Sequence, residues 1–154
     1  RAVIEVNMLS AIFLIQSVVR GMQSRRFGRI VNITSAMVKS PRPHMALSCA
    51  ARTGLTAFAK ALSLEVARDN VTINQLLPER IDTPRQIQMT ERTMKVHGLT
   101  WDEARSKIAR SIAAQRFGTP EEFASACAFL CAAQSGFISG QNLQLDGGSS
   151  PGLL

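Results

Sequence analysis

The chain has 154 residues, of which 45% are hydrophobic and 19% are charged. These values exclude a disordered polypeptide and favour one globular domain. Lysine and arginine outnumber aspartate and glutamate by 18 to 11, for a net charge of +7. The basic residues are scattered, tyrosine is absent and Trp101 is the one tryptophan. A nucleic-acid surface built on aromatic stacking is therefore not expected.

The same composition bears on membranes. No uninterrupted apolar run reaches the roughly 20 residues that span a bilayer, and no basic-then-apolar leader opens the chain. The longest apolar stretch, residues 11–19, is interrupted by Gln16 and Ser17. We therefore expect a core helix there, in a cytoplasmic protein that does not enter a membrane.

Helix and strand patterns alternate along the first half of the chain. Apolar residues recur at helical spacing through residues 1–22, which predicts a helix. Residues 29–35 (Arg-Ile-Val-Asn-Ile-Thr-Ser) are rich in β-branched side chains and predict a strand. After a loop with two prolines, residues 44–69 predict a long helix. A second strand is predicted at residues 71–77, where a proline follows and ends it.

The second half continues the alternation. Residues 82–97 are polar, contain methionines and receive no predicted element. Thr-x-x-Glu at 100–103 predicts a capping box at the start of a helix. Thr-Pro-Glu-Glu at 119–122 predicts a further helix, which ends near Gly136. Residues 142–148 predict a last strand and turn.

This alternation predicts an α/β fold, namely the C-terminal portion of a doubly wound (Rossmann-type) parallel sheet with helices on both faces. Such a sheet begins with a βαβ unit whose glycine-rich turn holds a pyrophosphate, and no such turn occurs in this sequence. We expect residues 1–154 to form a single domain, the catalytic-side part of a dinucleotide-binding domain. Its N-terminal cofactor-glycine half, roughly a hundred residues by the usual domain size, is expected to be missing.

The three cysteines cannot form a closed disulfide framework and lack a metal-like set of partners. No metal site is predicted. Cys127 and Cys131 lie four residues apart, on one face of a helix with no histidine nearby. We interpret both as small buried hydrophobic residues.

Four features in order carry a resemblance to a known family. Asn7 is followed by Gly-Arg-Ile-Val-Asn-Ile-Thr-Ser ending at Ser35, then by a helix thirteen residues on, then by INQLLPERIDT at 73–83. The closing segment RFGTPEEFASACAFLCAAQSGFISGQNLQLDGG fits as well. The chain resembles the short-chain dehydrogenase/reductase family, and most closely its 3-oxoacyl-carrier-protein reductase group. The resemblance covers nearly the whole chain and implies NAD or NADP as cofactor.

The resemblance also implies a catalytic set of four residues. In the family an asparagine positions a water, a serine holds the substrate carbonyl, a tyrosine donates the proton, and a lysine binds the nicotinamide ribose. Asn7 and Ser35 match the first two. The tyrosine position falls on Ser48 and the lysine position on Arg52, so Ser-x-x-x-Arg replaces Tyr-x-x-x-Lys.

These replacements keep the spacing and change the chemistry. Ser48 and Arg52 still share one helix face. A serine hydroxyl is a far weaker acid than a phenol and shorter by several ångströms, so Ser48 is not expected to donate the proton. Arg52 can still donate to ribose hydroxyls, with its own proton effectively fixed. His44, one turn before Ser48, is either a substitute general acid or a histidine that faces water.

The resemblance places a loop over the nicotinamide at residues 78–83. There Pro78, the backbone of Ile81 and the hydroxyl of Thr83 would contact the cofactor, and a surface turn is the alternative. The family usually has glycine where this chain has Glu79, which would bring a carboxylate near the cofactor.

Residues 82–110 would then form a flexible segment over the substrate. Met89, Met94 and Trp101 would either contact an acyl group or pack in the core.

Three functional hypotheses follow. The first is an NAD(P)-dependent oxidoreductase that acts on a small-molecule carbonyl or alcohol by an altered proton route. The second is a cofactor-binding pseudoenzyme with a scaffold or sensor role. The third is a free-standing interaction module that never had the N-terminal half. The sequence does not choose between NAD and NADP.

A stripe of small side chains predicts self-association. Its members recur at helical spacing on the long predicted helix: Ala46, Ala50, Gly54, Ala57 and Ala61. Small side chains let another helix approach closely, and the family pairs this helix in the same way. We expect a homodimer or homotetramer.

Overall fold

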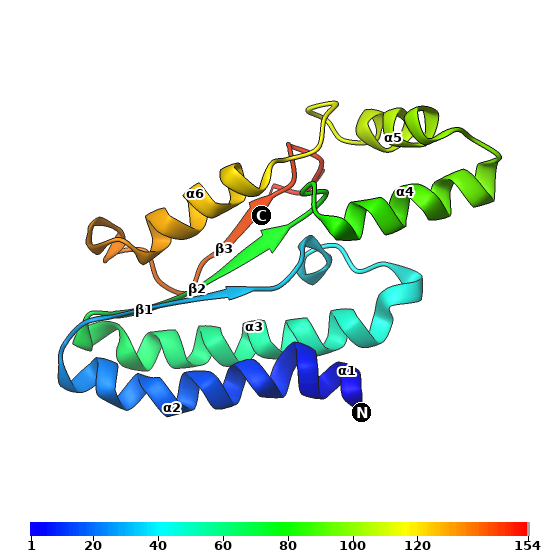
Figure 1. Cartoon of the computed structure of the whole chain (residues 1–154). Coiled ribbons are helices and arrows are strands. Elements are labelled where there is room, and N and C mark those ends of the chain that lie inside the picture. The colour runs from blue at the N-terminus through cyan, green and yellow to red at the C-terminus, as the bar shows by residue number, and fades with distance from the viewer. Residues whose placement is uncertain (154) are drawn as a thin grey trace.

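The computed structural model describes residues 1–153 and has an α/β architecture of three layers (Figure 1). A sheet of three strands, β1 (Gly28–Ile33), β2 (Val71–Pro78) and β3 (Asn142–Leu145), forms the middle layer. Helices α2 (Ser10–Ser24) and α3 (Ala46–Val66) cover one face of the sheet, and α6 (Pro120–Cys131) covers the other (Figure 1). The predicted fold class is confirmed.

The strands are parallel and lie in the order β1-β2-β3. Ile33 pairs with Leu76, and Pro78 pairs with Leu145. The central strand β2 is buried from Val71 to Leu77, as expected for a parallel strand that is covered on both faces. All three strands therefore end at one edge of the sheet, where the segments after them meet.

The N-terminal helix is interrupted by one irregular turn. It runs through α1 (Ala2–Ile4), a π-helical turn at Glu5–Leu9 and α2, where the sequence predicts one helix over residues 1–22. The side-chain amide of Asn7 donates to the Val3 carbonyl at 3.0 Å. π-helical turns often occur at functional sites.

The N-terminal helix also meets the simple criteria for a membrane-spanning segment. By length and composition alone, Ala2–Ser24 is apolar enough to cross a bilayer, although core helices and signal sequences meet the same criteria. Gln16 and Ser17 interrupt its apolar run, so a criterion of uninterrupted apolar residues does not detect it. Ile15 and Val19 are buried, and Val19 packs with Ala59 and Val71 in the core. Most of the remaining apolar surface of this helix is exposed.

The long helix predicted at residues 44–69 is present. A 3-10 turn at Pro43–Met45 leads into α3, and a second one at Ala67–Asp69 follows it. The buried face of α3 rests on the sheet. Gly54 faces the π-helical turn instead: a Cβ built on Gly54 would lie 2.7 Å from the Met8 sulfur. A larger residue at this position would require the Met8 side chain to move.

Residues 82–97, which received no predicted element, form a helix. α4 (Pro84–His97) begins with a proline in its first turn and ends at Gly98, which has a φ of 64°. The buried side chains of α4 are Gln86 and Thr90. The apolar periodicity that predicts helices is therefore weak here. Thr83-Pro84 and Gly98 are start and stop signals that would have predicted this helix.

The predicted capping box at Thr100 and the predicted helix start at Thr119 are confirmed, and the second helix start is a capping box as well. Thr100 and Glu103 cap α5 (Trp101–Arg110), and Thr119 and Glu122 cap α6. The last helix is shorter than predicted, because α6 ends at Cys131 and a 3-10 turn at Ala133–Ser135 follows.

The prediction for the cysteines of α6 is wrong in part. Cys131 is exposed and Cys127 is half-buried, whereas Cys49 on α3 is buried. Both lie in the last two turns of α6, whose buried residue is Leu130. A spacing of four residues places two side chains on one face without deciding that this face is covered.

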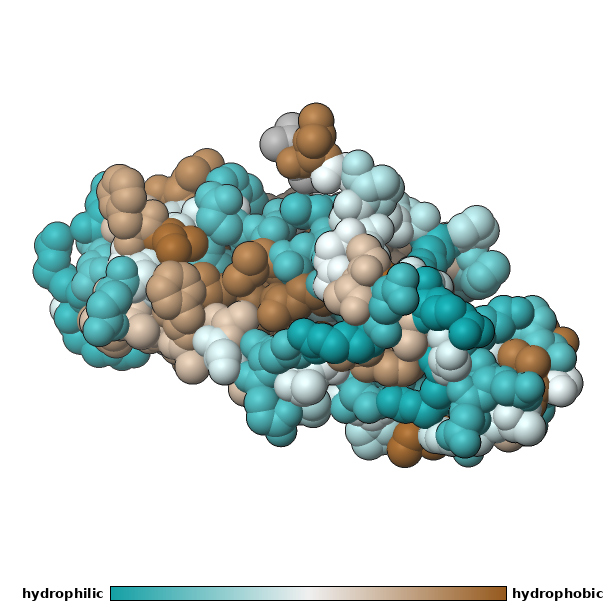
Figure 2. Space-filling model, turned by 90° about the horizontal axis from the view of Figure 1, so that it is seen from above, coloured by the Kyte–Doolittle hydropathy of each residue, from teal (hydrophilic) through white to brown (hydrophobic). Residues whose placement is uncertain are grey.

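One face of the sheet is incompletely covered. Figure 2 looks down on the α6 side and shows hydrophobic side chains in the middle of this face, bordered by hydrophilic ones. Among residues 1–153, β1 pairs with β2 alone, so its other edge is open. Ile33, at the end of β1, is 61% exposed.

The cap of α6 makes a pH-dependent contribution to stability. Arg116 donates to both carboxylate oxygens of Glu122, at 2.6 and 2.9 Å, and the Thr119 N–H donates at 2.8 Å. These bonds lower the pKa of Glu122 from 4.5 to about 2. Because the folded state holds the carboxylate ionised, this stabilisation is present above the unfolded pKa and is lost as the pH falls toward 2.

Glu122→Gln should therefore lower the melting temperature at pH 7, and the difference from the parent protein should shrink steadily between pH 4.5 and pH 2. Circular dichroism melts at several pH values measure this. Glu121→Gln is the matched control, because Glu121 makes no ion pair within residues 1–153. A difference for Glu122→Gln that is constant with pH would contradict the prediction.

Candidate active site

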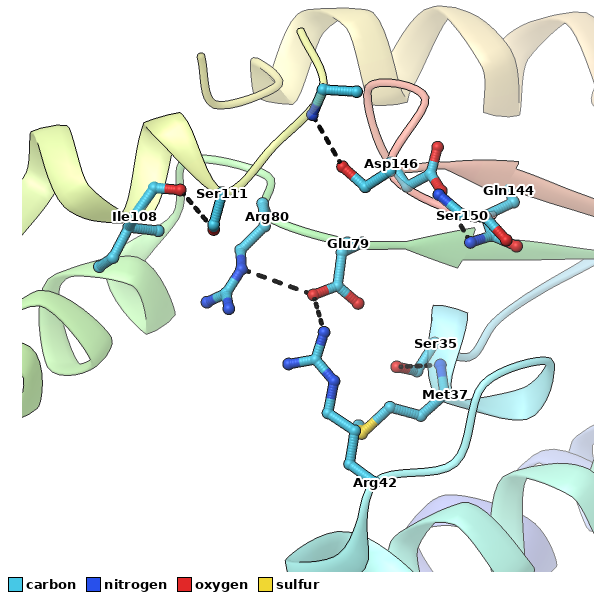
Figure 3. A network of polar contacts seen from close by, with 12 residues as sticks. Ser35, Met37, Arg42, Glu79, Arg80, Ile108, Ser111, Gln144, Asp146 and Ser150 are labelled. Atoms are coloured by element: carbon cyan, nitrogen blue, oxygen red, sulfur yellow. Dashed lines mark hydrogen bonds and ion pairs between the residues drawn. The ribbon is translucent and has the colours of Figure 1, made fainter. Parts of the chain in front are cut away.

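The polar residues that follow the strands meet at the carboxyl edge of the sheet. Ser35 follows β1, Glu79 and Arg80 follow β2, and Asp146 follows β3 (Figure 3). In open parallel sheets, ligands bind at this edge. Two of the cavities that open there share Ser35, Pro78, Arg80, Arg85 and Gln86 in their linings.

Ser35 is held in a fixed position. It has an extended backbone, is 9% exposed, and caps the 3-10 turn at Ala36–Val38. Its Oγ accepts the N–H of Met37 at 3.3 Å (Figure 3). Because that bond uses the oxygen as an acceptor, the hydroxyl hydrogen of Ser35 remains available to a ligand oxygen.

The first cavity, here called the Arg52 cavity, has a volume of about 300 Å³. It brings together five of the residues predicted for catalysis or cofactor binding: Ser35, Arg52, Pro78, Ile81 and Thr83. These residues come from the segment after β1, the second turn of α3, and the end of β2 with the loop that follows it. The fold thus gathers side chains that are far apart in the sequence.

The loop at 78–83 leaves backbone groups free at the predicted position. Ile81 and Gly118 form an isolated parallel bridge. Its hydrogen bonds join Gly118 to the Arg80 carbonyl at 3.1 Å and to the Asp82 N–H at 2.8 Å. The N–H and carbonyl of Ile81 itself take no part in the bridge. Thr83 precedes α4 without a side-chain capping bond, so its hydroxyl is free as well.

Two further polar atoms of the Arg52 cavity lack a partner. Thr34 and Gln86 line this cavity and are 6% and 7% exposed. The Thr34 hydroxyl and the Gln86 Oε1 have no hydrogen-bond partner within residues 1–153. A buried polar atom left unpaired costs about 1–3 kcal/mol. A ligand that donates hydrogen bonds would satisfy both.

The residues at the tyrosine and lysine positions contact each other. The guanidinium of Arg52 donates a hydrogen bond to the Ser48 hydroxyl. Burial lowers the pKa of Arg52, and the neighbouring Cys49 opposes this shift. Ser48 is half-buried and is not among the residues that line the two cavities.

The second cavity, here called the arginine cavity, has a volume of about 340 Å³. His44 and Met89 line it together with Ser35, so the candidate acid and the carbonyl-binding serine share one space. Four arginines line it as well: Arg42, Arg80, Arg85 and Arg92. Met94 and Trp101 line neither of the two cavities.

Glu79 turns away from the Arg52 cavity. Its carboxylate accepts from Arg42 at 2.7 Å and lies 3.5 Å from the Nε of Arg80 (Figure 3). Burial lowers the pKa of Arg80, with Glu79 opposing and Arg42 reinforcing the shift. Arg80 has a φ of 58°, a left-handed conformation that is uncommon for residues other than glycine. The Glu79 carboxylate, which was expected near the cofactor, is therefore held by Arg42 and Arg80 instead.

Asn7 lies apart from these residues. It belongs to the π-helical turn next to α3, and its side chain bonds to the Val3 carbonyl. It lines neither of the two cavities. Its assigned role, to position a water, stays a prediction.

Six polar residues that line the two cavities were not predicted from the sequence: Thr34, Arg42, Arg80, Arg85, Gln86 and Arg92. Arg85, Met89 and Arg92 recur at i, i+4 and i+7 on α4, the spacing of one helix face. Had residues 84–97 been predicted as a helix, this face would have been visible.

The fold and its ligand edge define the class of protein: a doubly wound α/β protein with cavities at the carboxyl ends of its parallel strands. The family model described as Enoyl-(Acyl carrier protein) reductase matches residues 1–150, and the chain belongs to this family within the short-chain dehydrogenases/reductases.

Curated relatives agree with this membership. The chain is 36% identical over 146 residues to 3-oxoacyl-[acyl-carrier-protein] reductase FabG of Rickettsia bellii (strain RML369-C), across 95% of the chain and 56% of the relative. It is 35% identical over 128 residues to NADPH-dependent reductase BacG of Bacillus subtilis (strain 168), across 83% of the chain and 49% of the relative. The chain thus spans about half the length of these relatives.

Solved structures of similar fold include reductases. YwfH, an NADPH dependent reductase involved in bacilysin biosynthesis, superimposes with a TM-score of 0.88 at 32% identity, over 95% of this chain and 56% of that one. L-sorbose reductase from Gluconobacter frateurii, complexed with NADPH and L-sorbose, gives a TM-score of 0.89 at 28% identity, over 98% of this chain and 58% of that one.

Proposed function

We propose that this chain forms the catalytic side of an NAD(P)-dependent oxidoreductase that interconverts a small-molecule carbonyl and its alcohol by an altered proton route. The observation that carries the proposal is the Arg52 cavity, which joins Ser35 to Arg52 and to the loop at 78–83. NADPH in the names of reductases similar to this chain supports the cofactor class.

The lining of the Arg52 cavity fits a nicotinamide. Its carboxamide carries both donors and an acceptor, which suit the free backbone groups of Ile81 and the hydroxyl of Thr83. The Thr34 hydroxyl and the Gln86 Oε1, buried without partners, would accept from such donors. Arg52 would donate to ribose hydroxyls. When bound, the cofactor supplies the hydride that reaches the carbonyl carbon.

The chain's own residues would orient and polarise the carbonyl. Ser35 donates its free hydroxyl hydrogen to the carbonyl oxygen, which stabilises the negative charge that develops there. That oxygen also needs a proton to become the alcohol. His44 lines the same cavity as Ser35 and is exposed to solvent, so it can exchange a proton with water and pass it inward.

The second candidate is a pseudoenzyme that binds the cofactor without turnover. It is favoured by the hydrogen bond between Arg52 and Ser48, because this bond engages the serine that stands at the tyrosine position. The two candidates agree on cofactor binding and differ on hydride transfer, so turnover separates them.

The domain organisation is part of the proposal. The open edge of β1 and the exposed Ile33 suit a further parallel strand, since an unpaired edge leaves backbone groups without partners. A half-domain with the glycine-rich turn would dock there and complete the cofactor site.

Arg52→Met should weaken NADPH binding about 10- to 100-fold, because a hydrogen bond from a charged group is worth about 1.5–3 kcal/mol. Fluorescence titration with NADPH of the complete protein, including the half-domain with the glycine-rich turn, measures this. Arg20→Met, on the exposed face of α2, is the control and should leave affinity unchanged. Equal affinity of the Arg52→Met variant and the parent would remove Arg52 from the cofactor site.

Ser48→Ala should change turnover little, because this hydroxyl is occupied by Arg52 and is a poor acid. His44→Ala should slow carbonyl reduction by about 10²- to 10⁴-fold, the usual contribution of a positioned general acid. Stopped-flow oxidation of NADPH measures both. If His44→Ala does not slow the reaction, water is the proton donor. If the parent protein turns over rapidly and Ser48→Ala abolishes that activity, the altered proton route is refuted.

The surface of α2 and α3 supports self-association as a further part of the proposal. Large apolar side chains are exposed on these two helices: Phe13, Leu14, Val18, Leu47 and Leu64. The alanines of the small stripe, 46, 50, 57 and 61, are exposed too, while Gly54 is half-buried. A contiguous apolar surface rimmed by polar residues marks an interface. We propose that α2 and α3 pair with a second copy.

Light scattering should give the mass of a dimer or tetramer at micromolar concentration, and Leu64→Arg should shift it toward a monomer, because the new charge would be buried in the interface. Ile87→Arg, on the exposed face of α4, is the matched control and should not change the mass. A parent protein that is monomeric at this concentration contradicts the prediction.

A further inference from the structure

The arginine cavity has a strongly unbalanced lining. Four arginines and one glutamate face it, and these five side chains leave a surplus of three positive charges. The arginines come from different elements: Arg42 precedes α3, Arg80 follows β2, and Arg85 and Arg92 lie on α4. A cavity that gathers like charges from three segments raises the local concentration of anions.

The one carboxylate in the cavity lining forms ion pairs with only two of the four arginines. Glu79 pairs with Arg42 and Arg80. None of the ion pairs within residues 1–153 involves Arg85 or Arg92. Arg85 donates to the neutral side chain of Gln88 at 2.9 Å. Two guanidinium groups therefore face this cavity without a countercharge.

Nearby acidic groups do not remove the surplus. Asp82 is bound by both terminal nitrogens of Arg105, at 2.7 and 3.2 Å. Asp146 lines an adjacent cavity and accepts from Gly148 and Ser150 at 2.9 and 2.8 Å. The first turn of α4 contains no acidic residue, so the positive end of that helix adds to the same potential.

α4 directs the two free arginines to the same side. Arg85, Met89 and Arg92 lie at i, i+4 and i+7, on one face of the helix, and all three line the cavity. The apolar Met89 lies between the two charged groups. Such an arrangement suits a short ligand that has an apolar or neutral middle and an anionic end.

Gln86 and Ser35 connect the two cavities. Gln86 is 7% exposed, its Oε1 has no partner within residues 1–153, and it lines both cavities. Ser35 also lines both. With the nicotinamide in the Arg52 cavity, as the proposed function has it, a molecule whose carbonyl lies at Ser35 has the arginine cavity for its remainder.

We propose that the carbonyl substrate is itself an anion, with a carboxylate or phosphate group held by Arg85 and Arg92 and its carbonyl directed to Ser35. This inference rests on the proposed function for the carbonyl end. Guanidinium groups bind both kinds of anion through paired hydrogen bonds. The cavity thus selects an acidic oxo compound over a neutral one of the same shape.

Matched probes test the charge preference by isothermal titration calorimetry. Acetoacetate and acetoacetamide have nearly the same shape and differ in charge, and glycerone phosphate and glycerone test the phosphate arm. At least one anion should bind tenfold or more tightly than its neutral counterpart, and the preference should fall as salt is raised. The pair of probes that shows the larger preference for the anion tells whether the ligand group is a carboxylate or a phosphate.

Charge-removing variants locate the site. Arg92→Gln and Arg85→Gln should each cut the preference for the anion tenfold or more while affinity for the neutral probe stays the same. Arg20→Gln on α2 removes an equal charge outside the cavity lining and should have no effect. Because both arginines are on the exposed helix α4, unchanged circular dichroism of the variants is expected, and either variant suffices if the other unfolds.

Equal binding of charged and neutral probes would overturn the inference, as would a preference that survives both substitutions or no binding of either anion. These outcomes are separate from failure of the proposed function. NADPH binding and turnover of neutral carbonyls would leave that function standing without the inference. Anion binding that depends on Arg85 and Arg92, with no NADPH binding, would support the inference and contradict the proposed function.

Discussion

The whole site depends on the parallel pairing of three strands. β2 is fully buried and hydrogen-bonds to β1 on one side and to β3 on the other. Because all three run in the same direction, Ser35, Glu79 and Asp146 leave the sheet together. A slip of one residue in the pairing of β1 with β2 would turn alternate side chains to the opposite face. Ser35 would then no longer point toward the loop at 78–83.

The basic residues at this edge give the site its chemical character. Arg52 lines one cavity, Arg42 and Arg92 line the other, and Arg80 and Arg85 line both. Glu79 offsets part of this charge through Arg42 and Arg80, and it occupies the position where the family has glycine. The chain's overall charge of +7 includes the arginines concentrated at this edge.

The strands, the long helix α3 and the capped helices were predictable from local signals. β-branched runs, a long helical pattern and Thr-x-x-Glu boxes each depend on near neighbours in the sequence. α4 was not predicted because its buried side chains are Gln86 and Thr90, and polar core residues leave no apolar period.

The Arg52 cavity was predictable only through the family resemblance, which supplied Ser35, Arg52 and the loop at 78–83. The arginine cavity was not predictable, because its lining comes from segments that only the fold brings together. The exposure of Cys131 shows the same limit: spacing fixes a helix face, and only tertiary packing decides whether that face is covered.

The hydrogen bond from Arg52 to Ser48 makes these two positions a single unit in any attempt at redesign. A side chain larger than serine at position 48 would have to displace the guanidinium, and a side chain other than arginine at position 52 would leave the serine hydroxyl without its donor. Residues in contact do not contribute independently to stability. A path from Ser-x-x-x-Arg to Tyr-x-x-x-Lys through one substitution at a time therefore passes through a mismatched pair, and this epistasis favours exchanging both residues at once.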